Sequence, residues 1–164
     1  MSFRIRSIIA VTALFFALFN STTYAASKAP DFSLKGDKAA VKLSSYRGSV
    51  VYVDFWASWC KPCRKSFPFL NEMHERYKSK GLKVIGINLD TDAGDARKFL
   101  EKFPASFTIA YDPQGNTPKQ YQLSVMPTSY LIDRKGNLIN IHKGFKEGQT
   151  QDLEQKIQKA LAQK

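Results

Sequence analysis

The sequence predicts one α/β domain in which helices cover both faces of a central mixed β-sheet. Two nearly continuous apolar runs, residues 50–55 and 83–89, are typical of strands that are buried on both faces. An amphipathic segment follows each run, as the crossover between parallel strands requires. Near the C-terminus, two short apolar segments flank residues 133–137, whose Gly136-Asn137 turn predicts an antiparallel hairpin.

The chain has 164 residues, of which 43% are hydrophobic and 24% are charged. This length and composition suit one well-filled core and leave little room for a second domain. The apolar runs are too short to span a membrane, which takes about 18 residues. The net charge of +11 raises the question of nucleic acid, but lysine and arginine are scattered along the chain. We therefore expect no nucleic-acid partner.

The first 25 residues resemble a secretory signal. Arg4 and Arg6 precede an apolar run of twelve residues, and the small residues Ala25 and Ala26 follow a polar stretch. This three-part pattern predicts cleavage after residue 25, which leaves residues 26–164 as an exported, periplasmic domain. An uncleaved N-terminal membrane anchor is the alternative.

The first half of the exported chain predicts an N-terminal extension, a strand and a helix. Residues 29–46 form a loop and a short hairpin that turns at Gly36-Asp37-Lys38. After the strand at 50–55, a helix runs from residue 60 to about 79. Its apolar residues recur every four positions, at Phe69, Met73 and Tyr77, and Gly81 ends it.

The second half continues the alternation of strands and helices. A helix at 92–103 follows the strand at 83–89, and then come a strand at 107–110 and a helical turn at 114–121. The hairpin strands are 129–132 and 138–141. Thr150 is expected to cap a final helix, in which Leu153, Ile157 and Leu161 form the apolar face.

The chemistry is expected at Cys60 and Cys63, the only cysteines of the chain. A disulfide between them would close a loop too small to stabilise the fold appreciably, so redox chemistry explains the pair better. Cys-x-x-Cys at a strand-to-helix junction is a redox motif. The helix N-terminus and the cations Lys61, Arg64 and Lys65 should lower the pKa of Cys60, and Cys63 could then attack a mixed disulfide.

Metal and haem sites are less consistent with the same cysteines. A zinc site would need two further ligands, and His74 and His142 are unsupported candidates, the second most simply exposed. Attachment of a c-type haem would need histidine directly after Cys63, where Arg64 stands. We therefore expect neither a metal nor a bound cofactor.

Asp54 interrupts the apolar strand six residues before Cys60. Burial of an ionised carboxylate is costly, so a buried aspartate usually has a raised pKa or a compensating partner. Asp54 is therefore expected to have a raised pKa or a partner, and a satisfied structural residue at a strand end is the simplest interpretation to weigh against a chemical role.

Residues 56–63, Trp-Ala-Ser-Trp-Cys-Lys-Pro-Cys, resemble the active site of the thioredoxin superfamily. The resemblance extends from about residue 29 to the C-terminus. Three further segments resemble its exported TlpA-like or ResA-like branch: Ala29-Pro30-Asp31-Phe32, Cys63-Arg64-Lys65-Ser66-Phe67-Pro68, and Pro127-Thr128 leading into residues 131–136. The resemblance implies a thioredoxin-like fold.

The resemblance also assigns roles to individual residues. It implies that Asp54 exchanges protons with Cys63, and that Pro127 is a cis-proline facing the cysteine pair. Met126 would offer its backbone to an incoming peptide, and Trp59 and Pro62 would contact the substrate.

The sequence departs from the family pattern at two positions. Ser66 stands where ResA-like members often have glutamate, and Gly86 stands where thioredoxins often have a lysine near the buried acid. These differences weaken a specific role in cytochrome c maturation and suggest that protons are handled differently.

The resemblance implies an exported, monomeric thiol–disulfide oxidoreductase that reduces the disulfides of client proteins. Reducing work in an oxidising compartment needs an electron donor, so a DsbD-like or CcdA-like membrane thiol transporter is the implied partner. Two alternatives remain. One is a peroxiredoxin-like thiol peroxidase, although Ala57 stands where such sites usually have threonine or serine; the other is a non-catalytic binding module or chaperone.

Overall fold

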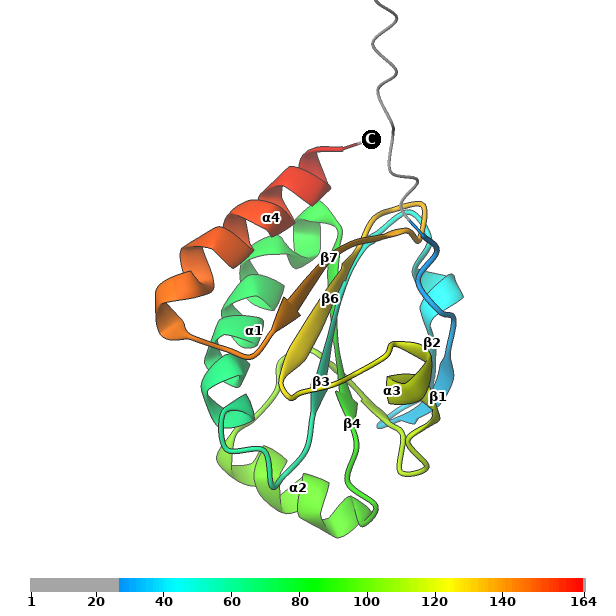
Figure 1. Ribbon diagram of the computed structural model, residues 1–164, viewed down its shortest axis with the longest axis vertical. Coiled ribbons are helices and arrows are strands. Elements are labelled where there is room, and N and C mark those ends of the chain that lie inside the picture. Colours follow the sequence, from blue (N-terminus) through cyan, green and yellow to red (C-terminus); the bar gives the residue numbers. More distant parts are fainter. Residues whose placement is uncertain (1–26, 164) are drawn as a thin grey trace, which may run out of the picture.

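The computed structural model describes residues 27–163, and the expected signal at 1–25 lies outside them. Seven strands form one sheet in the order β2-β1-β5-β4-β3-β6-β7. The chain runs through β1 (Ser33–Gly36), β2 (Ala40–Lys42), β3 (Val50–Trp56), α1 (Cys63–Tyr77), β4 (Leu82–Asn88), α2 (Ala93–Lys102), β5 (Thr108–Tyr111), α3 (Asn116–Gln120), β6 (Thr128–Ile132), β7 (Leu138–Lys143) and α4 (Thr150–Ala162). Figure 1 shows the twisted sheet between α1 and α4 on one side and α3 on the other.

The sheet is mixed, as the sequence predicts. Strand β3 pairs in parallel with β4, and β4 pairs in parallel with β5. The other pairs are antiparallel, including the predicted β6–β7 hairpin. The N-terminal hairpin β1–β2 joins this sheet through an antiparallel contact between β1 and β5. The predicted extension is therefore confirmed as two additional strands on the β5 side of the sheet, with β2 at the edge.

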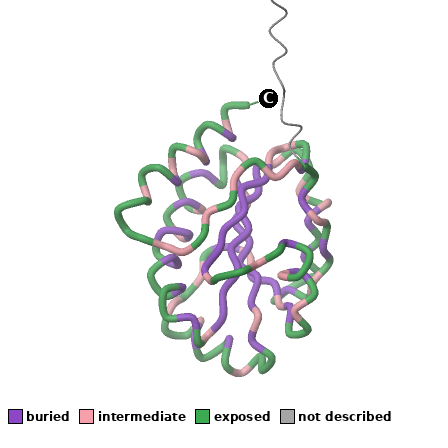
Figure 2. The backbone as a smooth tube through the Cα atoms, viewed as in Figure 1, coloured by how far each residue is buried: buried purple, intermediate pink, exposed green. Residues whose placement is uncertain are grey.

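All seven residues of β3 are buried, because each face of the sheet is covered by a separate apolar cluster. Tyr52 and Trp56 pack into the first cluster with α1, α2 and α4. Val53 and Phe55 alternate with them and pack into the second cluster, which Tyr121 closes beside α3. Figure 2 shows this buried centre as the purple strands of the sheet, surrounded by exposed helices and loops.

The predicted helices are confirmed, with two corrections at their first turns. Helix α1 begins at Cys63 and not at Cys60, because Pro62 occupies the N-cap position and Cys60 lies in the preceding turn. Thr150 is the first residue of α4 and does not cap it. Its hydroxyl donates instead to the carbonyl oxygen of Glu147, at 2.9 Å, in the 3₁₀ turn before the helix.

Within residues 27–163, no helix is long and apolar enough to cross a membrane. Gly81 ends the first helical segment with φ near 94°, in the left-handed region that glycine adopts without strain, as the sequence predicts.

Candidate active site

Cys60 and Cys63 form a disulfide where the loop after β3 enters α1. Their sulfur atoms are 2.03 Å apart and their Cα atoms are 5.4 Å apart. Cys60 keeps 5% of its surface exposed, whereas Cys63 is fully buried. Cys60, which the sequence predicts as the nucleophile, is therefore the more accessible of the two cysteines.

The local backbone explains why the pair lies at this junction. The Cys60 N–H donates to the Ala57 carbonyl, and the Cys63 N–H donates to the Cys60 carbonyl, so two tight turns link the strand to the helix. Pro62 supplies no N–H, and its fixed φ suits the entry into a helix. Cys60 consequently lies one turn beyond the N-terminal end of α1.

The three cations near the motif do not act equally on Cys60. Lys61 lines the same cavity as Cys60. The Arg64 guanidinium lies over the ring of Phe103, 5.9 Å from its centroid, and Lys65 forms an ion pair with Glu147 at 3.4 Å. The net positive charge around Cys60 is therefore smaller than the sequence predicts, because Glu147 offsets the charge of Lys65.

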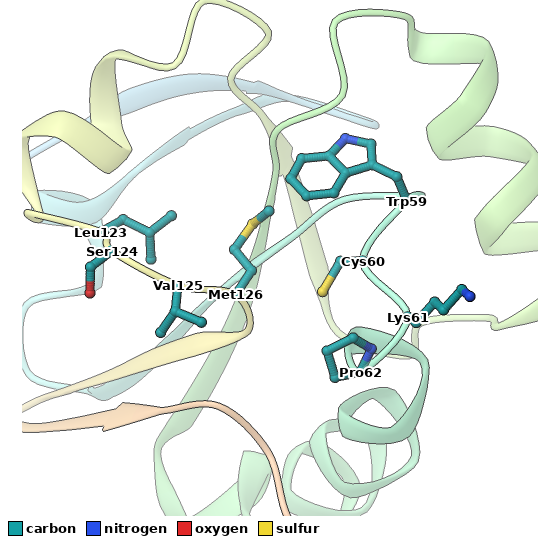
Figure 3. Close-up of a pocket in the computed structure, with 8 residues that line it drawn as sticks. All are labelled: Trp59, Cys60, Lys61, Pro62, Leu123, Ser124, Val125 and Met126. Atoms are coloured by element: carbon teal, nitrogen blue, oxygen red, sulfur yellow. The ribbon is translucent and has the colours of Figure 1, made fainter.

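A cavity of about 570 Å³ opens beside the cysteine pair. Figure 3 shows the indole of Trp59, the side chain of Met126 and the ring of Pro62 around the Cys60 sulfur. Trp59 is 66% exposed, although its side chain is large and apolar. The walls come from the active-site loop and from the loop before β6: Trp59, Cys60, Lys61, Pro62, Leu123, Ser124, Val125 and Met126.

The bond between Met126 and Pro127 is cis, as the resemblance implies. The Pro127 carbonyl accepts a hydrogen bond from the Gly144 N–H at 2.7 Å. Met126, in contrast, makes no hydrogen bond to another backbone group within residues 27–163. Its N–H and carbonyl are therefore available on the wall of the cavity.

Asp54 is fully buried on the sheet face that α1 covers. Its Oδ1 accepts a hydrogen bond of 2.6 Å from the Ser129 hydroxyl, and its Oδ2 has no partner among the described residues. Burial raises the pKa of Asp54 from its ordinary value of 3.8 to about 7, although the hydrogen bond from Ser129 lowers it. A carboxyl with this pKa can exchange a proton near neutral pH.

The strand on the other side of Asp54 shows why the family's lysine is missing. Gly86 lies directly opposite Asp54 in the β3–β4 register. A Cβ atom at Gly86 would come within 2.9 Å of the Phe107 ring and 3.1 Å of the Trp56 Nε1. The rings of Trp56 and Phe107 fill the space that a side chain would need, so Asp54 has no cation beside it on β4.

Sequence reasoning missed a buried carboxylate that holds the active-site loop. Asp90 accepts hydrogen bonds from the Ser58 N–H at 2.9 Å and from the Ser58 hydroxyl at 2.9 Å. Asn88 donates a third bond to the same carboxylate, at 2.8 Å. Because Ser58 lies two residues before Cys60, Asp90 fixes the loop that carries Trp59. The polar Asn88-Leu89-Asp90 at the end of an apolar strand was the available signal.

Neither histidine lines the cavity beside the cysteines, and His142 departs from its predicted exposure. His142 is half-buried, and its Nε2 is a buried atom with no partner among the described residues. The Nδ1 of His74 is in the same situation, on α1.

The fold and the site together define a thiol–disulfide oxidoreductase: a mixed sheet with a redox-active Cys-x-x-Cys pair at the N-terminal end of its first long helix. Residues 24–157 match the model of the Redoxin family, and the chain belongs to that family.

Relatives with assigned functions agree with this class. The chain is 35% identical over 135 residues to the thiol-disulfide oxidoreductase ResA of Bacillus thuringiensis subsp. konkukian, an alignment that covers 80% of this chain and 76% of the relative. It is 37% identical over 121 residues to ResA of Geobacillus kaustophilus, which covers 72% and 68%.

Solved structures confirm the predicted thioredoxin-like fold. A crystal structure from Chlorobium tepidum, described as a thiol:disulfide interchange protein DsbE, superposes with a TM-score of 0.82 at 54% identity and covers 84% of this chain and 97% of that one. The exposed lipoprotein thioredoxin Etrx1 of Streptococcus pneumoniae superposes with a TM-score of 0.70 at 28% identity, covering 79% and 99%.

Proposed function

We propose that the protein is an exported reductase of protein disulfides, in which Cys60 is the nucleophile and Cys63 is the resolving cysteine. The observation that carries this proposal is the position of Cys60, which lines a cavity that its partner does not reach. A client disulfide can approach Cys60 from the cavity, whereas Cys63 is fully buried behind it.

The reaction begins with the reduced pair. The Cys60 thiolate attacks one sulfur of the client disulfide, so that a Cys60–client disulfide forms and the first client thiolate leaves. Cys63 then gives its proton to Asp54 and attacks the Cys60 sulfur. The Cys60–Cys63 disulfide forms, the second client thiolate leaves, and two electrons have passed from the protein to the client.

The cavity supports recognition of an extended polypeptide. Trp59 and Val125 expose large apolar surface, at 66% and 47%, on the two sides of the opening. We infer that Met126 pairs with the client backbone through its free N–H and carbonyl, while Trp59 and Pro62 contact the client side chains. Pro127 holds Met126 in place.

The reductase must be recharged by a second thiol protein, because each turnover leaves the disulfide form. A DsbD-like or CcdA-like membrane transporter is the proposed donor, and residues 26–164 would act as a periplasmic monomer after removal of residues 1–25. The signal-like N-terminus supports this location. The exposed lipoprotein described for a relative of the same fold supports it as well.

Reduction of insulin by dithiothreitol tests the assignment, with the rate read as precipitation of the released chains. We expect the wild-type protein to accelerate the reaction and the Cys60→Ser variant to lose all acceleration. Cys63→Ser should lose turnover while still binding insulin covalently. A Cys60→Ser variant that matches wild type would refute the proposal and favour a binding module. Consumption of hydrogen peroxide in preference to insulin would favour a thiol peroxidase.

A further inference from the structure

A second cavity, of about 280 Å³, lies beside the active-site loop and is called the basic cavity below. Its walls include Ser58 of the loop, Arg64 in the first turn of α1, and Lys98 and Lys102 of α2. Figure 1 shows α2 next to the loop that joins β3 to α1. Ser58 stands directly before Trp59, which lines the first cavity. The active-site loop therefore contributes to the walls of both cavities.

The basic cavity carries an excess of positive charge. Arg64, Lys98 and Lys102 are exposed cations on its wall, and Asp95 is an exposed acid among them. Within residues 27–163, Lys98 pairs with Asp95 at 3.6 Å, whereas neither Arg64 nor Lys102 forms an ion pair. The carboxylate of Asp90 is buried behind the loop and is already hydrogen-bonded. Two positive charges therefore lie uncompensated on the cavity wall.

The side chains are arranged to bind a carboxylate. The Arg64 guanidinium lies over the ring of Phe103, 5.9 Å from its centroid. This contact restrains the side chain, and the planar N–H donors of a guanidinium suit two parallel hydrogen bonds to a carboxylate. Lys98 and Lys102 are four positions apart on α2, so their ammonium groups project from the same face of the helix. The cavity thus combines one restrained fork of donors with two flexible cations.

The location of the basic cavity favours an acidic polypeptide as its ligand. A client disulfide under attack must lie at Cys60, and an extended client chain advances about 3.3 Å per residue. Ser58 precedes Cys60 by two residues, and Arg64 opens the helix directly after Cys63. A client side chain two to four residues from the reacting cysteine can therefore reach the cavity. A membrane surface bound at the same place would cover the opening beside Trp59 through which a client enters.

We propose that the basic cavity is a subsite for an acidic side chain of the client, two to four residues from the cysteine that Cys60 attacks. The inference rests on the proposed function and names the class of client: polypeptides with aspartate or glutamate close to the disulfide. The first cavity accepts an extended chain of any charge, whereas Arg64, Lys98 and Lys102 select acidic ones. Complementary charge steers such a client to Cys60 and fixes its register there.

The test compares two peptides that differ only in charge. Each has a single cysteine, activated as a disulfide with 2-thiopyridine, and carries either glutamate or glutamine three residues before and after that cysteine. Attack by Cys60 forms the Cys60–peptide disulfide and releases the coloured thione, so the rate constant is read from absorbance. We expect the wild-type protein to react with the glutamate peptide about fivefold faster at low ionic strength. The preference should fall toward one in about 0.5 M sodium chloride.

Three variants locate the preference on the molecule. Lys102→Glu should abolish it, because the new carboxylate repels the peptide. Lys159→Glu is the matched control: it reverses the charge of another exposed lysine in the last turn of a helix, and α4 contributes to neither cavity. It should retain the preference. Asp95→Asn frees Lys98 from its ion pair and should raise the preference about twofold. Each readout is a ratio of two rates in one variant, so a partly unfolded sample does not change it.

The outcomes separate this inference from the proposed function. If both peptides react with wild type at the same rate, the inference fails and the proposed function stands. If neither peptide reacts at Cys60, the proposed function fails and the inference fails with it. Equal loss of the preference in Lys102→Glu and Lys159→Glu would overturn the inference by assigning the effect to net charge. Binding to phosphatidylglycerol vesicles that Lys102→Glu abolishes, without any peptide preference, would overturn it in favour of a membrane surface.

Discussion

At the scale of single residues, Asp54 has the environment that best explains the chemistry. Its position inside a strand with no other charge predicted burial from the sequence alone. The structure adds the cause of its basicity, since burial raises its pKa to about 7 while one oxygen has no described partner. The sequence could not show that Ser129 supplies the one hydrogen bond, because that contact joins residues 75 positions apart.

Replacement of Asp54 by asparagine should stabilise the fold in a pH-dependent way. The folded pKa of about 7 lies above the unfolded value of 3.8, so the stability that Asp54 contributes is present at low pH and is lost as pH rises through 7. We expect Asp54→Asn to gain up to roughly 3–4 kcal/mol at pH 8 relative to its effect at pH 4. Urea denaturation at the two pH values measures this difference.

The same variant should nevertheless slow disulfide exchange, because asparagine cannot accept the Cys63 proton. We expect a loss of about 10²-fold in the rate of insulin reduction at neutral pH. A stabilised variant with an undiminished rate would contradict the role of Asp54 as proton acceptor.

Cys60 and Cys63 should differ in reactivity once they are reduced. Cys60 lines the cavity, whereas Cys63 is fully buried. We expect iodoacetamide to label Cys60 at least tenfold faster at neutral pH, because it is the accessible cysteine and lies one turn before the N-terminus of α1, whose dipole favours a thiolate. Peptide mapping after short labelling measures the ratio, and equal labelling of the two cysteines in the folded protein would argue against this assignment.

At the scale of elements, the sequence predicted the strands and helices well because their hydrophobic patterns are strong. The sequence-based predictions were wrong or incomplete where one element joins the next, because single side chains determine the structure there. Helix α1 begins three residues after the predicted start because Pro62 and the turn at Cys60 precede it. Thr150 has the residue type of a cap, yet the 3₁₀ turn at Glu147 takes its hydroxyl. The bond from Asp90 to Ser58 depends on two loops that only the folded sheet brings together.

The close packing of β4 against two aromatic rings predicts that Gly86 cannot accept a side chain. Gly86→Ala would place a Cβ 2.9 Å from Phe107 and 3.1 Å from Trp56. We expect a loss of about 1–3 kcal/mol in the free energy of unfolding. Gly148→Ala is the matched control, since its Cβ would meet no atom within 4 Å. Equal stability of the two variants would show that the rings can move aside.

At the scale of the whole molecule, the sequence predicted the class of protein because the Cys-x-x-Cys motif and the order of strands and helices along the chain indicate the same class. The Cys-x-x-Cys pair needs a strand-to-helix junction, and the alternating apolar segments supply it. The resemblance pointed to Met126, but the other residues of the second cavity wall, Leu123, Ser124 and Val125, could not be predicted, since they lie more than 60 positions after Cys60. The sequence also overestimated the net positive charge around Cys60, because the ion pair between Lys65 and Glu147 depends on a tertiary contact.

The reduction potential follows from the balance of charges at the site. Lys61 and the helix N-terminus favour the Cys60 thiolate and so the reduced form, whereas the positive charge of Lys65 is offset by Glu147. We expect a potential above about −270 mV, the value of thioredoxin, and well below about −120 mV, that of DsbA. Equilibration with glutathione, followed by alkylation and mass measurement, determines it. A value near −120 mV would mark the protein as an oxidant.

The most direct test of thiol–disulfide exchange through Cys60 is the covalent intermediate itself. The reduced Cys63→Ser variant is mixed with a peptide that contains one disulfide, and the intact mass of the product is measured. Because the resolving cysteine is absent, we predict a stable adduct of one peptide, attached at Cys60 and released by dithiothreitol. If no adduct forms, or if the Cys60→Ser variant accumulates the same adduct at Cys63 at the same rate, the assignment of Cys60 as nucleophile is contradicted.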